Sequence, residues 1–137
     1  MTNRAVIHTK RAPEAIGTYS QAVKVDNTVY LSGQIPLIPD TMELVDGGFE
    51  AQAEQVFANL TGALRAAGAA WPDVVKMTGF MVGMNADNVA AYREARNRYV
   101  KQAELPASTL VGLERLVDPD LVLLGHRQQT PTQPRAT

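Results

Sequence analysis

The amino-acid sequence predicts an α/β fold of the α+β type, in which one mixed β-sheet carries two helices on a single face. Two long segments have apolar residues at three- and four-residue spacing, which is typical of amphipathic helices. Short runs rich in β-branched and aromatic residues lie before, between and after these segments. The resulting order is strands, helix, strand, helix, strand, strand, which suits one sheet covered on one side.

The N-terminal part of the chain predicts three strands. The run "RAVIHT" (4–9) is a short candidate strand. The run "YSQAVKVDNTVYLSG" (19–33) predicts two strands that meet at Asp26 and Asn27, a residue pair that favours a tight hairpin turn. A loop rich in proline and acidic residues follows, "PLIPDTMELVDGG", so the sheet is expected to be interrupted there.

The two helices and the last strands follow from periodicity and from capping residues. Apolar residues recur on one face from Phe49 onward, and the first helix is expected to end at Gly68. The run "VVKMTGFMVGM" predicts a strand. Asn85 and Asp87 are suited to cap a second helix, which reaches about Gln102. The runs "ASTLVGLERLV" and "PDLVLLGHRQQ" predict the last two strands.

Assembly and domain organisation follow from the same pattern. Several predicted strands lack polar alternation, so the sheet face opposite the helices is expected to be apolar and to need a cover. No further helix is available, and we therefore expect a homo-oligomer, with a closed ring as the natural arrangement. Residues 1–128 are predicted to form a single domain. Residues 129–137 contain prolines and little apolar surface, so we expect a disordered C-terminal tail.

Composition excludes several classes of function. The 137 residues have a formal net charge of −1 and no basic stripe, which disfavours nucleic acid as a partner. No cysteine is present, and His8 and His126 stand outside any ligand motif, so we expect no metal and no other cofactor. No stretch is as long as a membrane span, and the N-terminus lacks the apolar core of a signal peptide. A cytoplasmic protein without membrane contact is therefore expected.

The residues that could carry chemistry lie in three short motifs, because no GxSxG, P-loop or GxGxxG motif is present. These motifs are "GTYSQAV", "LSGQIP" and "LPASTLVG". Gly33 lacks a side chain, so its backbone could approach a bound molecule; a plain exit loop explains the same residues. Tyr19 could equally be a core aromatic residue, and Ser108 could simply begin a strand.

Most of the chain resembles a known family. The segments "APEAIGTYSQAVKVDNTVYLSGQIPL", "AQAEQVFANLTGALRAAGA", "DVVKMTGFMVGM" and "LPASTLVGLERL" are similar to the reactive intermediate deaminase family, also called the RidA, YjgF or L-PSP-like family, over roughly residues 12–124. The resemblance implies a chorismate-mutase-like subunit and a homotrimer with a pocket in each subunit cleft. In active members it implies cofactor-free hydrolysis of enamines and imines to a ketoacid and ammonia.

The sequence departs from the family pattern at the pocket. Ser108 occupies the position of the arginine that grips the substrate carboxylate, and Leu123 and Gly125 occupy the two acidic positions of the last strand. Tyr92 falls where a pocket asparagine is frequent. A guanidinium offers two charge-assisted hydrogen bonds and a hydroxyl at most one neutral donor, so the loss of carboxylate binding is about 1.5–3 kcal/mol.

Other positions match the family. Tyr19 matches the hydroxyl at the cleft, and Ser32 with Gly33 matches the strand end whose backbone amide faces the ligand. The resemblance therefore implies one catalytic residue, Tyr19, and the following substrate-binding residues: Ser32, Gly33, Tyr92, Ser108, Leu110 and Leu123.

These residues lead to one main functional hypothesis and several alternatives. We expect a small-molecule-binding protein with a cleft at the trimer interface, which binds or hydrolyses an enamine, an imine or another reactive intermediate other than ordinary 2-imino acids. A hydrolytic deaminase with an altered substrate belongs to this hypothesis. The alternatives are a classical 2-iminoacid deaminase that releases ammonia, a ribonuclease, and a pathway auxiliary without catalysis. The acidic balance of the chain argues against the ribonuclease.

Overall fold

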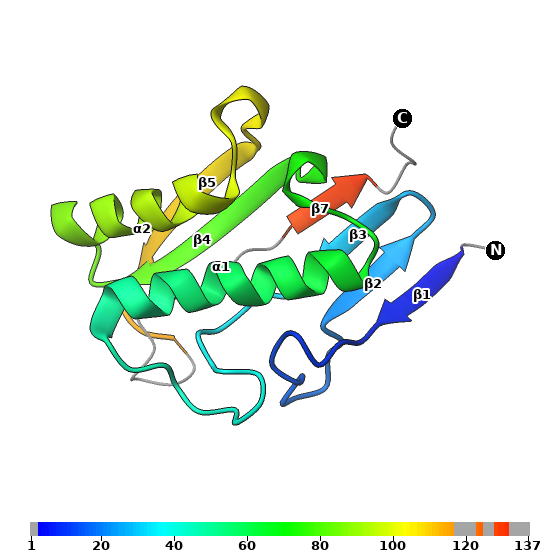
Figure 1. The fold of residues 1–137 in the computed structure, drawn as a ribbon, viewed down its shortest axis with the longest axis horizontal. Coiled ribbons are helices and arrows are strands. Elements are labelled where there is room, and N and C mark those ends of the chain that lie inside the picture. Colours follow the sequence, from blue (N-terminus) through cyan, green and yellow to red (C-terminus); the bar gives the residue numbers. More distant parts are fainter. Residues whose placement is uncertain (1–2, 117–122, 125–127, 132–137) are drawn as a thin grey trace.

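Both helices lie on one face of a mixed β-sheet in the computed structural model, which describes residues 3–116, 123–124 and 128–131 (Figure 1). The elements are β1 (Arg4–Ile7), β2 (Ala22–Val25), β3 (Thr28–Leu31), α1 (Gly48–Ala66), β4 (Lys76–Val82), α2 (Ala86–Tyr99), β5 (Ala107–Leu113), β6 (Leu123–Leu124) and β7 (Gln128–Pro131). Short 3-10 turns span Trp71–Asp73 and Gln102–Glu104. The predicted α/β class is confirmed.

The sheet is mixed, as expected. Its strand order is β1-β2-β3-β7-β4-β5, and β6 pairs with β4 beside this path. Only β4 and β5 pair in parallel among the described strands, and the other pairs are antiparallel. The hairpin between β2 and β3 places Val25 opposite Thr28, so Asp26 and Asn27 form the turn. Asp26 adopts a φ of 50°, a conformation that aspartate and asparagine tolerate better than most residues.

The helix boundaries agree with their sequence signals. α1 ends shortly before Gly68, whose φ of 79° lies in the left-handed region that glycine favours. The side chain of Asn85 caps α2 by accepting the backbone N–H of Asn88 at 2.8 Å. α2 then ends at Tyr99, earlier than the expected end near Gln102, where a separate 3-10 turn begins.

The segment predicted as a disordered tail is partly a strand. Residues 128–131 form β7, which pairs with β3 in the register Thr28 to Pro131 and Leu31 to Gln128. The prediction of disorder from residue 129 is therefore wrong for residues 129–131. This strand is held by backbone pairing, for which a polar segment without apolar alternation gives no sequence signal. Residues 125–127 and 132–137 lie outside the described residues.

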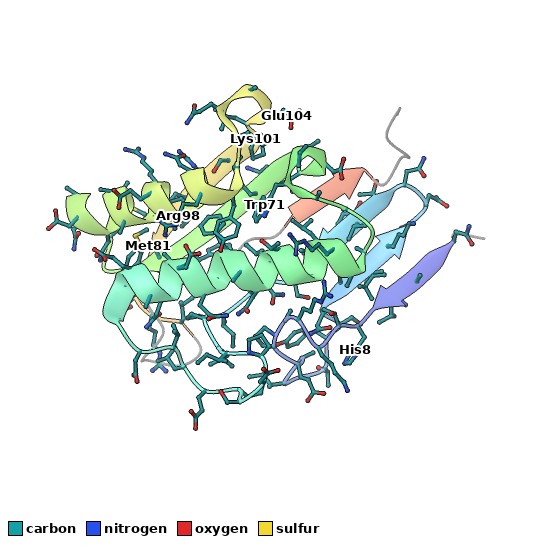
Figure 2. All side chains as sticks on the ribbon, viewed as in Figure 1. His8, Trp71, Met81, Arg98, Lys101 and Glu104 are labelled. Atoms are coloured by element: carbon teal, nitrogen blue, oxygen red, sulfur yellow. The ribbon has the colours of Figure 1, made fainter. Side chains whose placement is uncertain are left out.

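The core lies between the two helices and the sheet. Phe57 of α1 is fully buried, and its ring centroid lies 5.7 Å from that of Trp71, 5.8 Å from Tyr92 and 5.5 Å from Tyr99. These aromatic rings join α1, α2 and the turn before β4, and Figure 2 shows Trp71 in this region. The sheet contributes Met77 and other residues whose side chains point toward the helices; the buried ones include Val29, Leu31 and Met81.

The opposite face of the sheet, here called the open face, carries exposed apolar side chains among polar ones, and no element in the described part of the chain covers it. Alternation along β4 buries Met77 and Met81 under the helices and leaves Phe80 half-buried on the other face. Val6 and Tyr30 also belong to this open face by strand register, and they are 57% and 45% exposed. The uncovered apolar face matches the expectation from the strand pattern, and its oligomeric cover remains a prediction.

An interaction between the two helices centres on Glu54. Its carboxylate forms an ion pair with Arg98 at 2.7 Å and accepts the hydroxyl of Tyr99. Partial burial raises the pKa of Glu54, but the hydrogen bonds from Tyr99 and Arg98 and the positive charge of Arg98 outweigh burial, so this pKa lies below its ordinary value of 4.5. The charged carboxylate therefore stabilises the fold above the unfolded-state pKa, and this contribution disappears as the pH falls through the lower folded-state pKa.

A Glu54→Gln variant is expected to reveal this contribution. At pH 7 the variant should have a free energy of unfolding lower by about 0.2–1 kcal/mol, a small value because solvent screens the half-exposed pair. At pH 3, which lies below the unfolded-state pKa, the difference should shrink, because the unfolded state then binds a proton more readily than the folded state does. Urea unfolding at both pH values measures this. Glu104→Gln, at an exposed residue far from this pair (Figure 2), serves as the control. An equal difference at both pH values would contradict the expectation.

Candidate functional site

A cavity of about 580 Å³ opens beside the end of β3. Its volume lies within the range of about 300–1,000 Å³ that is usual for small-molecule sites. The described residues that line it come from β1, the segment before β2, β2, β3 and β4: Arg4, Thr18, Tyr19, Ser20, Val23, Tyr30, Leu31, Ser32, Lys76 and Thr78. Two predicted site residues, Tyr19 and Ser32, therefore line the same cavity.

Hydrogen bonds fix the end of β3 against the segment that carries Tyr19. The backbone N–H of Ser32 donates to the carbonyl oxygen of Gln21 at 3.0 Å, and the Ser32 hydroxyl donates to the carbonyl oxygen of Ser20. Tyr19 is 49% exposed, and its hydroxyl oxygen lies 3.4 Å from the backbone nitrogen of Ile16, which donates to it. The Tyr19 hydroxyl can still donate its own proton into the cavity.

A buried glutamine supports this wall of the cavity. Gln21 is only 3% exposed, and its Nε2 lies 2.7–3.2 Å from the carbonyl oxygens of Thr9, Ala12 and Pro13. Its Oε1 accepts the backbone N–H of Thr9 at 2.7 Å. The segment before Tyr19 is thus tied to the start of β2. Sequence reasoning missed this role, although an amide inside an apolar strand pattern is a signal for it.

The loop after β3 is held by two further buried amides. Asn59 of α1 is fully buried, and its Nδ2 donates to the carbonyl oxygens of Ile35 and Leu37, both at 2.9 Å. Gln34 is 5% exposed, and its Nε2 donates to the carbonyl oxygen of Ser32 at 3.2 Å. Buried polar groups are costly unless they are hydrogen-bonded, so these contacts fix one loop conformation. Gly33 lies within this loop but does not line the cavity.

The predicted residues Tyr92, Ser108 and Leu110 form a second group, on the helix-covered side of the sheet. Ser108 of β5 is in register with the buried Met77 of β4. Tyr92 of α2 is 2% exposed, and a Cβ added at Gly79 would lie 3.3 Å from its hydroxyl oxygen and 2.9 Å from Cδ1 of Leu110. Glycine at position 79 therefore allows α2 to pack closely on β4.

The environment of Tyr92 is apolar apart from a few polar neighbours. Burial raises the pKa of Tyr92 to about 12, against the opposing effects of the Arg96 charge and of a hydrogen bond with Ser108. Tyr92 is therefore neutral at physiological pH. Ser108 itself is exposed. This second group offers hydroxyl groups at the position that the family resemblance assigns to an arginine.

Leu123 belongs to β6 and pairs with Met81 of β4 through the backbone. Its side chain lies outside the described residues, as do Gly125, His126 and Arg127. Within one subunit the structure brings Tyr19 and Ser32 together, and separately Tyr92, Ser108 and Leu110. Among the residues that the structure describes, no group of three or more histidine, cysteine, aspartate or glutamate side chains could hold a metal ion. None of the described helices is long and apolar enough to cross a membrane.

The structure is an α/β subunit with a cavity on the open face of its sheet. Residues 9–123 match the family model Ribonuc_L-PSP, described as Endoribonuclease L-PSP. The chain is 45% identical to mouse 2-iminobutanoate/2-iminopropanoate deaminase over 104 residues, which are 76% of this chain and 75% of that protein. It is 40% identical to the Dermatophagoides farinae protein of the same name, over 85% of this chain and 88% of that one. The chain belongs to the RidA/YjgF (L-PSP) family.

Solved structures agree with this assignment. RidA from Psychrobacter sp. PAMC 21119 has a TM-score of 0.84 and 39% identity, and the alignment covers 93% of this chain and 98% of that one. Escherichia coli TdcF with bound serine has a TM-score of 0.81 and 31% identity, with coverage of 93% and 98%. The RidA family and its fold, which the sequence motifs predict, are thus confirmed.

Proposed function

We propose that this chain binds, and in its active form hydrolyses, an enamine, an imine or another reactive intermediate other than ordinary 2-imino acids. One observation carries the restriction on the substrate. Ser108 is exposed on the edge strand β5 next to the neutral hydroxyl of Tyr92, so residue 108 itself supplies no cation to a carboxylate; the positive charge that acts on Tyr92 comes from Arg96 of α2. A hydroxyl gives a carboxylate less than the paired, charge-assisted bonds of a guanidinium.

Tyr19 is the proposed catalytic residue. Tyr19 lines the cavity, and its hydroxyl accepts the N–H of Ile16 while keeping its own proton, so we infer that it can donate a hydrogen bond to an imine nitrogen or orient the attacking water. Ser32 holds the facing strand end in place through its bonds to residues 20 and 21. In this scheme no cofactor takes part.

A homotrimer of chorismate-mutase-like architecture is proposed as the functional assembly. The uncovered face with Val6 and Tyr30 supports it, because such a patch is normally covered in solution. The cavity lies beside this face, so a second copy would complete its walls. Light scattering should give a mass about three times 14.8 kDa, and a monomer would contradict the proposal.

The substrate restriction is tested with 2-iminobutyrate generated in situ. The chain should release ammonia from it little faster than buffer, because position 108 lacks the carboxylate anchor. The mouse relative named above serves as the positive control. Imines and enamines without a carboxylate next to the reacting carbon should react faster, and a Tyr19→Phe variant should lose that rate. Acceleration on 2-iminobutyrate comparable to that of the mouse relative would overturn the restriction.

Classical 2-iminoacid deamination is the second candidate. The names of relatives that are 40–45% identical favour it, as does the serine in the structure of TdcF. The same assay separates the two candidates. In this case Tyr19 would act as proposed, and the carboxylate would need an anchor other than Ser108.

A further inference from the structure

Two cationic side chains, Arg4 and Lys76, line the cavity, whereas Ser108 does not. We infer that the cavity holds its ligand through an anionic group, bound chiefly by Lys76 of β4 and assisted by Arg4 of β1. This inference deepens the proposed function, on which it rests for the choice of the cavity as the ligand site. It names the ligand class as organic molecules with a carboxylate or a phosphate that lies away from the reacting carbon, which distinguishes them from 2-imino acids.

Lys76 is positioned on the cavity wall by the sheet. It alternates along β4 with the buried Met77, so its side chain belongs to the open face. Its Nζ donates to Oγ1 of Thr109 on the neighbouring strand β5, at 2.9 Å. An ammonium group has three N–H donors, and this bond uses one. The Thr109 contact therefore orients the ammonium group and leaves two donors for an anion.

No carboxylate neutralises this charge in the described part of the chain. The ten described lining residues include two cations and no acid. The ion pair found among the described residues joins Arg98 to Glu54, and neither Lys76 nor Arg4 takes part in one. Charges of one sign in a concave site attract counter-ions. The cavity is therefore suited to an anion.

The rest of the lining suits an organic anion. Hydroxyl-bearing side chains make up most of the rest of the lining, and Val23 adds apolar surface; the hydroxyl groups belong to Thr18, Tyr19, Ser20, Tyr30, Ser32 and Thr78. Hydroxyl groups can donate hydrogen bonds to the oxygen atoms of an anion. The volume of about 580 Å³ exceeds what a four-carbon imino acid fills.

The two cations contribute unequally. Four strand-to-strand steps separate β1 from β4 in the sheet order, which is roughly 19 Å at about 4.8 Å a step. A single small anion is therefore not expected to contact both groups. Lys76, held by Thr109, is the anchor, and the exposed Arg4 acts at longer range.

The test is a titration of the full-length protein at low ionic strength, followed by NMR amide shifts or calorimetry. The probes are inorganic phosphate, 4-oxopentanoate, whose carboxylate lies away from its carbonyl carbon, and the uncharged ketone butanone. The wild type should bind one or both anions and bind butanone far more weakly. Lys76→Gln should weaken anion binding about ten- to a hundred-fold, the loss expected for a charge-assisted hydrogen bond. Arg4→Gln should weaken it two- to five-fold.

Two further variants serve as controls. Lys101→Gln removes the same charge at an exposed residue that does not line the cavity, and it should leave affinity unchanged within a factor of two. Thr109→Val keeps the charge of Lys76 but removes its positioning bond, and it should weaken binding less than Lys76→Gln does. Circular dichroism checks that each variant is folded.

Several outcomes would overturn the inference: no binding of either anion by the wild type, or equal losses in Lys76→Gln and Lys101→Gln. The two anion probes separate phosphate from carboxylate ligands. Because the titration requires no turnover, its result is independent of the proposed hydrolysis. Hydrolysis of a neutral imine without anion binding would reject this inference alone, and anion binding without any imine hydrolysis would reject the proposed function alone.

Discussion

Replacing Phe57 with alanine is expected to lower the free energy of unfolding by about 3–5 kcal/mol, a large part of the roughly 5–15 kcal/mol that stabilises a typical domain. Phe57 is fully buried and contacts the rings of Trp71, Tyr92 and Tyr99. The substitution removes apolar burial and leaves a cavity where α1, α2 and the sheet meet. The surrounding backbone belongs to regular elements, so it can refill that space only in part.

Urea unfolding followed by circular dichroism measures this change. Leu105→Ala serves as the control, because Leu105 is 54% exposed and its truncation should cost well under 1 kcal/mol. Phe57→Leu should cost less than Phe57→Ala, because it retains more of the buried volume. If the alanine variants at positions 57 and 105 unfolded at the same urea concentration, the aromatic cluster would not be the centre of the core.

Introducing arginine at position 108 is expected to raise the hydrolysis of 2-iminobutyrate about ten- to a hundred-fold. A guanidinium gains about 1.5–3 kcal/mol over a hydroxyl in binding a carboxylate. Ser108 is exposed on the edge strand β5, so a long side chain can be accommodated without overpacking the core. Within one subunit Ser108 lies on the helix-covered side and the cavity opens on the other face, so the gain requires that the proposed trimer brings position 108 of one subunit to the cavity of its neighbour. The initial rate of ammonia release, corrected for the buffer rate, is the measurement.

Gln102→Arg is the matched control for this gain of function. It adds the same charge at an exposed residue of the 3-10 turn before β5, and this residue does not line the cavity. It should therefore give no comparable increase. Adding Leu123→Glu to Ser108→Arg should raise the rate further, because the resemblance places a water-orienting acid at position 123. No gain from the double variant would show that the pocket differs from the family at other positions too.

Local sequence signals were sufficient for the elements that depend on nearby residues. Three features depend on conformational preferences of residues that are close in sequence, and each is found where it was predicted. They are the apolar face of the helix around Phe57, the helix cap at Asn85 and the turn at Asp26. β7 was missed because its polar residues join the sheet through backbone pairing with β3. Such pairing depends on a segment that is distant in sequence, so no local sequence pattern predicts it.

The candidate site was only partly predictable for the same reason. The sequence motifs predicted Tyr19 and Ser32 as site residues, and both line the cavity. They also predicted that Ser108 replaces an arginine. They gave no indication of Lys76 or of the buried amide of Gln21. From the sequence alone Lys76 is indistinguishable from an ordinary surface lysine. In the structure the register of β4 and β5 places it on the cavity wall, and a hydrogen bond to Thr109 orients its ammonium group.

The sequence by itself determined the fold class, the family, the two helices and the hairpin, and its resemblance to the family predicts that Ser108 replaces an arginine. Only the tertiary structure decided which residues surround one cavity, because Arg4, Tyr19, Tyr30 and Lys76 lie far apart along the chain and meet through strand pairing. The physical reason is that helices and tight turns arise from interactions between neighbours in sequence. A binding site depends on long-range register and on buried hydrogen bonds, which exist only once the sheet has formed.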